Sequence, residues 1–232
     1  MELIWQGTVQ AFWLIVRGDP EVMAITSLSV KLSGIATTLS LLLGIPLGTV
    51  IGLSRFPGRD VVLSLVNTGM GLPPVVVGLF VSIFLWRSGP LGLLELLYTP
   101  SAIVIAQFII AFPVVTGLTV AAMQQIDPRL RLQLLGLGAS RTQMLWQLLR
   151  EARLSILAAV MAGFGSVISE IGASMMVGGN ILGYTRVLTT ATVLETAKGN
   201  FDVAIALSLI LLGITFLINW ALTTIQQRSV AR

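Results

Sequence analysis

The chain has 232 residues, of which 55% are hydrophobic and only 10% are charged, and a soluble domain of this size could not bury so many apolar side chains. We therefore expect an integral membrane protein. Because the chain has no histidine and no cysteine, the usual metal ligands, disulfides and imidazole or thiol catalysts are excluded, and we expect neither an enzyme nor a bound cofactor. The formal net charge of +4 is spread along the chain without interleaved aromatic residues, so nucleic acid is not an expected partner.

Residues 1–21 form a predicted interfacial segment. Leu3–Val16 is apolar but only about 21 Å long as a helix, which is shorter than the hydrocarbon layer of a membrane. Its bulky apolar residues fall on one face at helical spacing, opposite Gln6 and Gln10, and they are Trp5, Val9, Phe12, Trp13 and Val16. We predict a helix that lies along the membrane surface.

Residues 22–227 form the predicted membrane domain. About 20 helical residues cross a hydrocarbon layer of about 30 Å, and five apolar stretches are long enough. The predicted helices are 22–54, 61–86, 96–126, 152–173 and 203–227. The expected fold class is therefore an all-α membrane protein with about five transmembrane helices, in which 127–151 and 174–202 are the polar connections.

The distribution of arginine and lysine predicts the orientation. If the connection 127–151 faces the cytoplasm, nine of the fourteen basic residues lie on the inner side, as the positive-inside rule favours. These nine are Arg55, Arg59, Arg129, Arg131, Arg141, Arg150, Arg153, Arg228 and Arg232. The N-terminus is then outside, the C-terminus is cytoplasmic, and the connection 174–202 is external.

The connection 127–151 alternates apolar and basic residues at helical spacing. Asp127 followed by Pro128 is typical of a helix start, Gly138 of a turn, and Ser140 of a second helix start. The pattern predicts two short helices, broken at the glycine, that lie on the membrane surface or dock in a groove of a partner protein. A basic loop that rests on lipid headgroups is the alternative.

This connection resembles the cytoplasmic coupling motif of type I ABC importer permeases, with Gly138-Ala139-Ser140 at the centre of the motif. Leu132-Gln133-Leu134 stands where that motif has Glu-Ala-Ala, and Arg150-Glu151 stands where it has Leu-Pro. Other segments are similar to the tungstate-type permeases, which are related to molybdate permeases. These segments are Arg55–Arg59, Gly71–Leu79, Ser88–Gly92, Ser169–Ala173, Val177–Ile181 and Thr185-Arg186.

The resemblance implies the MetI-like fold of these permeases. It also implies that the chain is one subunit of a transporter complex in a prokaryotic inner membrane. Two copies of the chain would pair with two cytoplasmic ATP-binding cassette subunits, and an external oxyanion-binding protein would deliver the cargo. Tungstate is the expected cargo and molybdate the next, with sulfate, phosphate or another small solute as alternatives. The residues implied in coupling to the ATPase are Asp127, Pro128, Leu134, Gly138, Ala139 and Ser140. A noncatalytic membrane scaffold is a different possibility, but it leaves the Gly138 turn without a purpose.

Glu170 is the one charged residue well inside a predicted crossing, and intramembrane carboxylates are costly enough to be functional candidates. A bare carboxylate would repel an anionic cargo. We expect Glu170 to pair with a cation such as Arg186, or to accept hydrogen bonds from backbone at a helix end, in a structural or gating role. The external loop carries Gly178, Gly179, Asn180, Thr185 and Arg186, which suit a passing oxyanion, a re-entrant plug or a docking surface.

Small residues form a stripe at helical spacing in the fourth predicted helix, and they are Ala158, Ala162, Gly165, Ser169 and Gly172. Such a stripe favours close helix packing or a moving seam at a two-fold interface. The polar groups available to line a passage are Thr37, Thr38, Asn67, Gln107, Thr116 and Ser169. Each of them could equally make an interhelical hydrogen bond.

Overall fold

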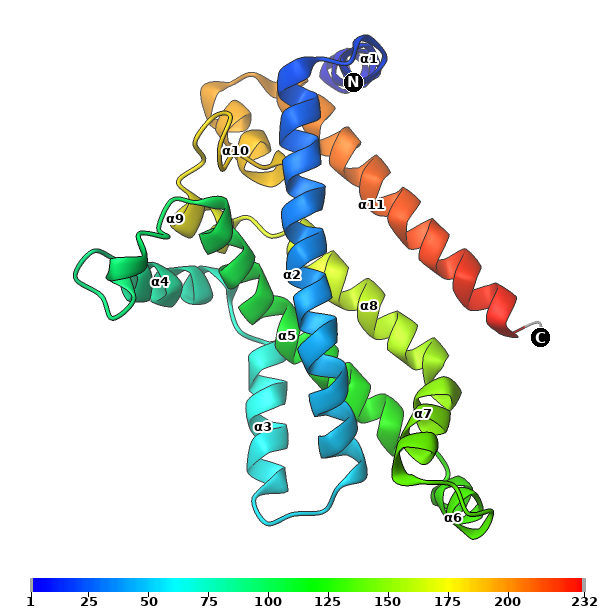
Figure 1. Cartoon of the computed structure of the whole chain (residues 1–232). Helices are drawn as coiled ribbons and strands as arrows, with labels where there is room; N and C mark the ends of the chain where they lie inside the picture. Colours follow the sequence, from blue (N-terminus) through cyan, green and yellow to red (C-terminus); the bar gives the residue numbers. More distant parts are fainter. Residues whose placement is uncertain (1, 231–232) are drawn as a thin grey trace.

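The computed structural model describes residues 2–230, and every regular element in this range is helical (Figure 1). Arg232, one of the nine basic residues assigned to the inner side, lies outside this range. The elements are α1 (Glu2–Arg17), α2 (Pro20–Leu53), α3 (Arg59–Met70), α4 (Pro74–Leu85), the 3-10 helix η1 (Gly92–Leu94), α5 (Pro100–Gln124), α6 (Pro128–Gly136), α7 (Arg141–Glu151), α8 (Arg153–Ile168), α9 (Gly172–Gly178), α10 (Leu188–Lys198) and α11 (Phe201–Val230).

Three of these helices, α2, α5 and α11, are long and apolar enough to cross a membrane. Two helix pairs are bent, α3 with α4 and α7 with α8, and the number becomes five if each pair is one span. The central contact is between α2 and α5, which lie side by side (Figure 1). A Cβ on Gly48 of α2 would lie 2.7 Å from the Thr116 carbonyl oxygen of α5, and one on Gly52 would lie 2.7 Å from Met123 Cβ. These glycines let the two backbones approach closely, as small residues do in lipid.

The predicted single helix 61–86 is wrong, because the chain turns sharply in the middle of it. Helices α3 and α4 are separate and differ in direction by 101°. The break lies at Gly71, Leu72 and Pro73, and Pro74 is the first residue of α4. The two prolines have no N–H for a continuous ladder, and each disfavours helical geometry in the residue before it, so α3 ends at Met70.

The predicted helix 152–173 is also wrong at its C-terminal end. Helix α8 stops at Ile168, and α9 begins after a short break at Gly172. Glu170 lies in this break, and its side chain accepts hydrogen bonds from the amides of Ala173 and Ser174, the second and third residues of α9, which favours the start of a new helix there. The polar connection 174–202 is likewise largely helical, since it contains most of α9 and all of α10.

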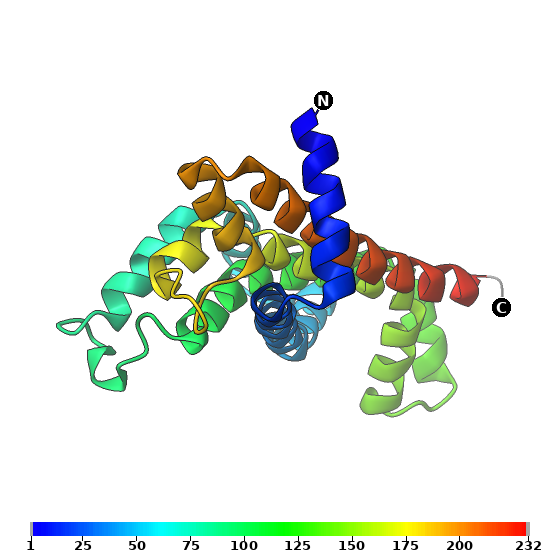
Figure 2. The ribbon, with the colours of Figure 1, turned by 90° about the horizontal axis from the view of Figure 1, so that it is seen from above.

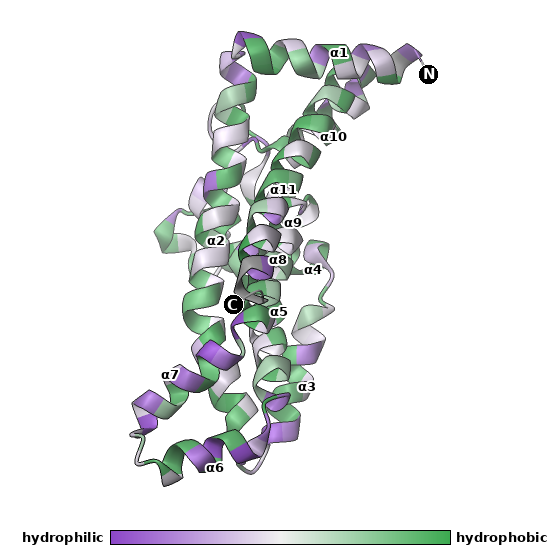
Figure 3. Cartoon of the chain, turned by 90° about the vertical axis from the view of Figure 1, so that its right-hand side faces the viewer, coloured by the Kyte–Doolittle hydropathy of each residue, from purple (hydrophilic) through white to green (hydrophobic). Residues whose placement is uncertain are grey.

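Hydrophilic residues are concentrated toward the two ends of the molecule, with the long apolar helices between them (Figure 3). Helices α1 and α10 lie at one end, and α6 and α7 at the other. Helix α1 crosses α11 (Figure 2), and Gly7 packs against Ile205 at the crossing. The side chains of Trp5, Phe12 and Trp13 remain exposed, as an apolar face turned toward lipid would be.

Candidate functional site

The hairpin of α6 and α7, residues 127–151, is called the elbow below, and its two helix starts agree with the sequence. The Asp127 carboxylate accepts a hydrogen bond of 2.8 Å from the Arg129 amide, with Pro128 as the first residue of α6. Ser140 and Gln143 form a capping box, in which each side chain accepts a hydrogen bond from the backbone amide of the other. Both predicted caps are confirmed.

Gly138 makes the turn between the two helices of the elbow. Its φ is +81°, a left-handed conformation that side chains disfavour. The Gly138 amide donates to the Leu135 carbonyl oxygen and the Ala139 amide to that of Leu134, each at 3.0 Å. These bonds use the last free carbonyls of α6, as at many helix ends closed by glycine. The six residues predicted for coupling therefore lie within one continuous hairpin.

The elbow carries a large exposed apolar surface beside its arginines. Leu137, next to the turn, is 84% exposed, Trp146 is 71% exposed and Leu132 is 68% exposed. On the opposite side, Met144 and Leu148 of α7 are buried, which holds the elbow to the rest of the chain. Bulky side chains exposed at a polar end of a membrane protein indicate a surface for a partner or for lipid headgroups.

The junction between α8 and α9 is organised by Glu170, which is 5% exposed. Its carboxylate accepts hydrogen bonds from the Ala173 amide at 2.7 Å, the Ser174 amide at 3.0 Å and the Ser174 hydroxyl at 2.8 Å. Of the two roles expected for Glu170, backbone hydrogen bonding at a helix end is correct. Pairing with Arg186 is wrong, because Arg186 lies beside Glu21 instead, with 3.6 Å between Nη1 and Oε1.

The backbone at this junction is satisfied by two other helices. Gln107 of α5 donates its side-chain amide to the Val167 carbonyl oxygen at 3.2 Å. The Thr189 hydroxyl of α10 donates to the Glu170 carbonyl oxygen at 2.9 Å. A helix break surrounded by apolar helices needs such donors, since lipid supplies none. We call this set the joint: Gln107, Val167, Glu170, Ala173, Ser174 and Thr189.

The segment from Gly178 to Arg186 folds on itself through hydrogen bonds among its own residues, although the buried Asn180 Oδ1 and Arg186 Nε have no hydrogen-bond partner among the described residues. The buried Thr185 hydroxyl accepts from the Ile181 amide at 2.9 Å and donates to the Gly178 carbonyl oxygen at 2.5 Å. Gly179 and Asn180 both have positive φ, and the Asn180 side chain donates to the Thr190 carbonyl oxygen at 3.4 Å. The predicted glycine-rich loop is thus a tight turn, with Arg186 at its edge.

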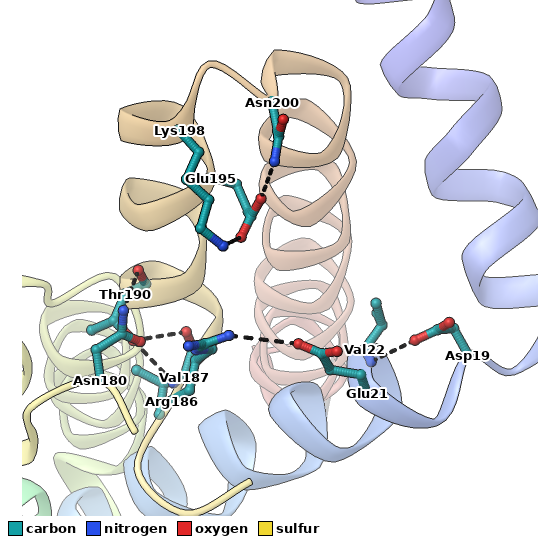
Figure 4. A network of polar contacts seen from close by, with 10 residues as sticks. All are labelled: Asp19, Glu21, Val22, Asn180, Arg186, Val187, Thr190, Glu195, Lys198 and Asn200. Carbon is teal, nitrogen blue, oxygen red and sulfur yellow. Dashed lines mark hydrogen bonds and ion pairs between the residues drawn. The ribbon is translucent and has the colours of Figure 1, made fainter. Parts of the chain in front are cut away.

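Charged residues gather around this turn at the α1 end (Figure 4). Arg186 reaches Glu21 at the start of α2, and Glu195 of α10 is bonded to Asn200 at 2.7 Å and Lys198 at 2.8 Å. Hydrogen bonds from Asn200 and then Lys198 lower the pKa of the Glu195 carboxyl below its ordinary value. This network ties the turn and α10 to the ends of α2 and α11.

The six predicted passage residues separate into two groups. Thr37, Gln107 and Thr116 are buried within the chain, and both threonine hydroxyls donate to carbonyls of their own helices. Within the single chain these three serve packing and hydrogen bonding, and their place in a passage stays a prediction. Thr38, Asn67 and Ser169 are exposed. They are the members of the set that can face a passage formed outside the chain.

The small-residue stripe of α8 also faces outward. Ala158, Ala162 and Ser169 are exposed, and a Cβ on Gly165 would meet nothing within 4 Å. Close packing within the chain instead uses other glycines, such as Gly163 against Val115 of α5. The stripe therefore packs against no helix of this chain over most of its length.

The contact between α4 and α9 gives a first testable prediction. A Cβ on Gly78 would lie 2.7 Å from Ala173 Cα, a backbone atom that cannot turn aside. We expect Gly78→Leu to destabilise the protein by about 1 to 3 kcal/mol, because the two short helices must separate. Thermal unfolding of the purified protein in detergent measures this effect. Gly213→Leu on α11, where a Cβ meets nothing within 4 Å, is the matched control, and an equal loss in both variants would contradict the prediction.

Comparison with known proteins decides the family. One family model, described as the inner membrane component of binding-protein-dependent transport systems, matches residues 44–230. The chain belongs to this family. The match covers the elbow, the joint and both bent helix pairs of this inner membrane component, whereas α1 and most of α2 precede the matched residues.

Similar proteins are named as permeases. A tungstate uptake system permease protein of Peptoclostridium acidaminophilum is 40% identical over 98% of this inner membrane component and all of its own length. A probable anion ABC transporter permease protein of Haloferax volcanii is 42% identical over 85% of the chain and 87% of the relative. A molybdenum transport system permease protein of Escherichia coli is 29% identical over 94% of the chain and all of the relative.

The fold agrees with solved transporter structures. The inward-facing methionine ABC transporter MetNI matches with a TM-score of 0.72 and 19% identity, over 94% of this chain and 97% of the other. An amino acid ABC transporter with histidines matches with a TM-score of 0.67 and 19% identity, over 94% of this chain and 98% of the other. The expected all-α, MetI-like fold is confirmed.

Proposed function

We propose that this chain is the permease subunit of an ATP-driven importer whose cargo is tungstate, with molybdate as the next candidate. One observation carries the proposal, namely the 40% identity over essentially the whole length of a tungstate uptake permease. The anion transporter relative at 42% identity supports the same class of cargo. ATP hydrolysis belongs to separate subunits, and the permease supplies the passage and the mechanical link.

The elbow is the proposed docking element for two ATP-binding cassette subunits. Its exposed Leu137 and Trp146 would enter an apolar groove of such a subunit. The exposed Arg141 and Arg150 of α7 would face acidic residues around that groove. This assignment places the elbow in the cytoplasm, the α1 end outside and the C-terminus of α11 inside. The excess of basic residues near the elbow supports that orientation.

The opposite end is the proposed site of two further interactions. The exposed Trp5 and Trp13 of α1 would anchor this helix in the outer lipid interface, where Arg17 lies 5.0 Å from the Trp13 ring centre. The oxyanion-binding protein would dock beside α1, on the charged surface that includes Glu21, Arg186 and Lys198 (Figure 4). Complementary charge on that protein would then fix its register.

A second copy of the chain completes the proposed passage. The unpartnered stripe of Ala158, Ala162 and Gly165 on α8 suits a close helix contact across a two-fold axis. Thr38, Asn67 and Ser169 are the proposed polar lining, since they are exposed on the single chain. In this scheme the joint has a gating role, because Glu170 lies between α8 and α9 and holds the start of α9 through its hydrogen bonds.

The cargo is tested by uptake into proteoliposomes that contain the permease, its ATPase subunits and its binding protein. We expect ATP-dependent uptake of tungstate, competed by molybdate at higher concentration and weakly by sulfate. Sulfate and tungstate carry the same charge but differ in size, so their ratio reports the selectivity of the assembled system. Preferential uptake of sulfate would overturn the cargo assignment, and complexes that hydrolyse ATP without moving any oxyanion would overturn the function.

A further inference from the structure

The C-terminal end of α2 is held by two arginines that belong to other elements. Helix α2 has 34 residues and no basic residue in its last turn, although the carbonyls at that end form the negative pole of the helix. Arg59 donates its Nε to the Ile51 carbonyl oxygen at 3.0 Å, and Arg131 donates its Nη1 to the Leu53 carbonyl oxygen at 3.2 Å. Both hydrogen bonds join a positive group to that negative pole, so each is charge-assisted.

The two arginines come from different parts of the chain. Arg59 is the first residue of α3, whereas Arg131 lies on α6 and is 78 positions beyond the carbonyl it binds. No residue of α6 is buried, so this helix lacks the apolar packing that anchors α7 through Leu148. The Arg131 hydrogen bond is therefore a direct connection from an otherwise loosely packed helix to a membrane helix.

The hydrogen bond between Arg131 and the end of α2 lies between a cavity, which leaves room for α6 to move, and the tightly packed helix pair α2 and α5. A cavity of about 400 Å³ lies between these elements, lined by Arg55, Arg59, Asp127 and Arg131 among others. Beyond it, α2 is packed tightly on α5 through Gly48 and Gly52. A displacement at the end of α2 would be passed along a rigid helix pair, since packed helices move as units.

We propose that Arg131, supported by Arg59, is the positioning residue that passes movement of the elbow to α2. This inference rests on the proposed docking of the elbow to ATP-binding subunits. Docking shifts α6, the Arg131 guanidinium carries the last turn of α2 with it, and α5 follows α2. Arg59 keeps that turn aligned with α3, so α3 and the α4 that follows it move together with α2.

Reconstituted complexes with tungstate as cargo test the proposal, with Arg131→Ala as the variant. We expect ATPase subunits to bind as in the natural protein, whereas the tungstate imported per ATP hydrolysed falls about threefold to tenfold, as expected when one charged hydrogen bond in a coupling path is lost. Arg131→Lys should restore part of this ratio, because it keeps one charged donor. Arg129→Ala, an exposed arginine on the same helix, is the charge-matched control and should leave the ratio unchanged.

If Arg131→Ala imported as much tungstate per ATP hydrolysed as Arg129→Ala does, the proposed role of Arg131 would be overturned and the proposed function would stand. Failure of the natural protein to bind ATPase subunits would instead overturn the proposed function.

A second experiment measures the distance between α2 and α6 directly. Because the sequence has no cysteine, spin labels attached at Val50→Cys and Gln133→Cys report this one distance. We expect that distance to stay constant on ATP addition in the natural background and to change or broaden with Arg131→Ala. A distance that responds equally in both backgrounds would refute the link.

Discussion

Replacing Glu170 with alanine is expected to cause a large loss of stability. The Ala173 amide, the Ser174 amide and the Ser174 hydroxyl would lose their common acceptor in a buried position. Each buried donor left without a partner costs about 1 to 3 kcal/mol, so we expect a total of about 3 kcal/mol or more. For a chain of this length that corresponds to a fall in Tm of about 6 to 12 °C, measurable by thermal unfolding in detergent.

Two variants separate the capping role of Glu170 from a role of its charge. Glu170→Gln keeps one acceptor oxygen and the side-chain shape, so it should lose less than half as much as alanine. Ser169→Ala is the neighbouring control, because the exposed Ser169 hydroxyl donates to the Gly165 carbonyl oxygen within its own helix. If Glu170→Ala proved as stable as Ser169→Ala, the three hydrogen bonds would not hold the joint together.

The elbow could be predicted from sequence because its signals are local. Asp127, Pro128, Gly138 and Ser140 each determine the conformation of residues within one helical turn, and their types alone suffice. The same holds for Pro100, which is the first residue of α5 and follows a Thr99 cap. Helix caps and turns of this kind can be predicted without knowing which helices pack against them.

The helix breaks between α3 and α4 and between α8 and α9 could not be predicted in full, because the hydropathy of a segment reports its composition and not the direction of the chain. Pro73 and Pro74 mark a kink, but the 101° turn between α3 and α4 also needs α9 to receive Gly78. Hydrogen bonding of Glu170 at a helix end was one of its two expected roles, but the sequence did not place that helix end within 152–173. The four-residue spacing of Gly44, Gly48 and Gly52 is a packing signal that was readable and was missed.

Buried polar side chains were the hardest to assign from sequence. Gln107 was expected among the possible passage residues, whereas it donates to a carbonyl 60 positions away at the end of α8. A polar residue in an apolar helix carries the same sequence signal whether it faces water or satisfies a break in a neighbouring helix. Only the position of that break separates the two cases.

Substituting valine for Gly138 is expected to disrupt the elbow without preventing insertion of the protein. A bulky side chain would not clash with neighbouring atoms, because a Cβ at this position meets nothing within 4 Å. The cost instead comes from the φ of +81°, which disfavours side chains by about 1 to 2 kcal/mol and more for a β-branched residue. Relief of this strain would re-aim α6 against α7 and remove the docking geometry.

The readout for Gly138→Val is oxyanion-stimulated ATP hydrolysis by the reconstituted complex, with membrane insertion checked in parallel. A strain of that size shifts a conformational equilibrium about fivefold to thirtyfold, so we expect stimulation to fall by a similar factor. Gly138→Asn should retain most activity, since asparagine tolerates the left-handed region. Gly136→Ala has free space around its Cβ and no positive φ, so it should behave as the natural protein. Unchanged stimulation in Gly138→Val would mean that the left-handed turn at Gly138 does not control coupling.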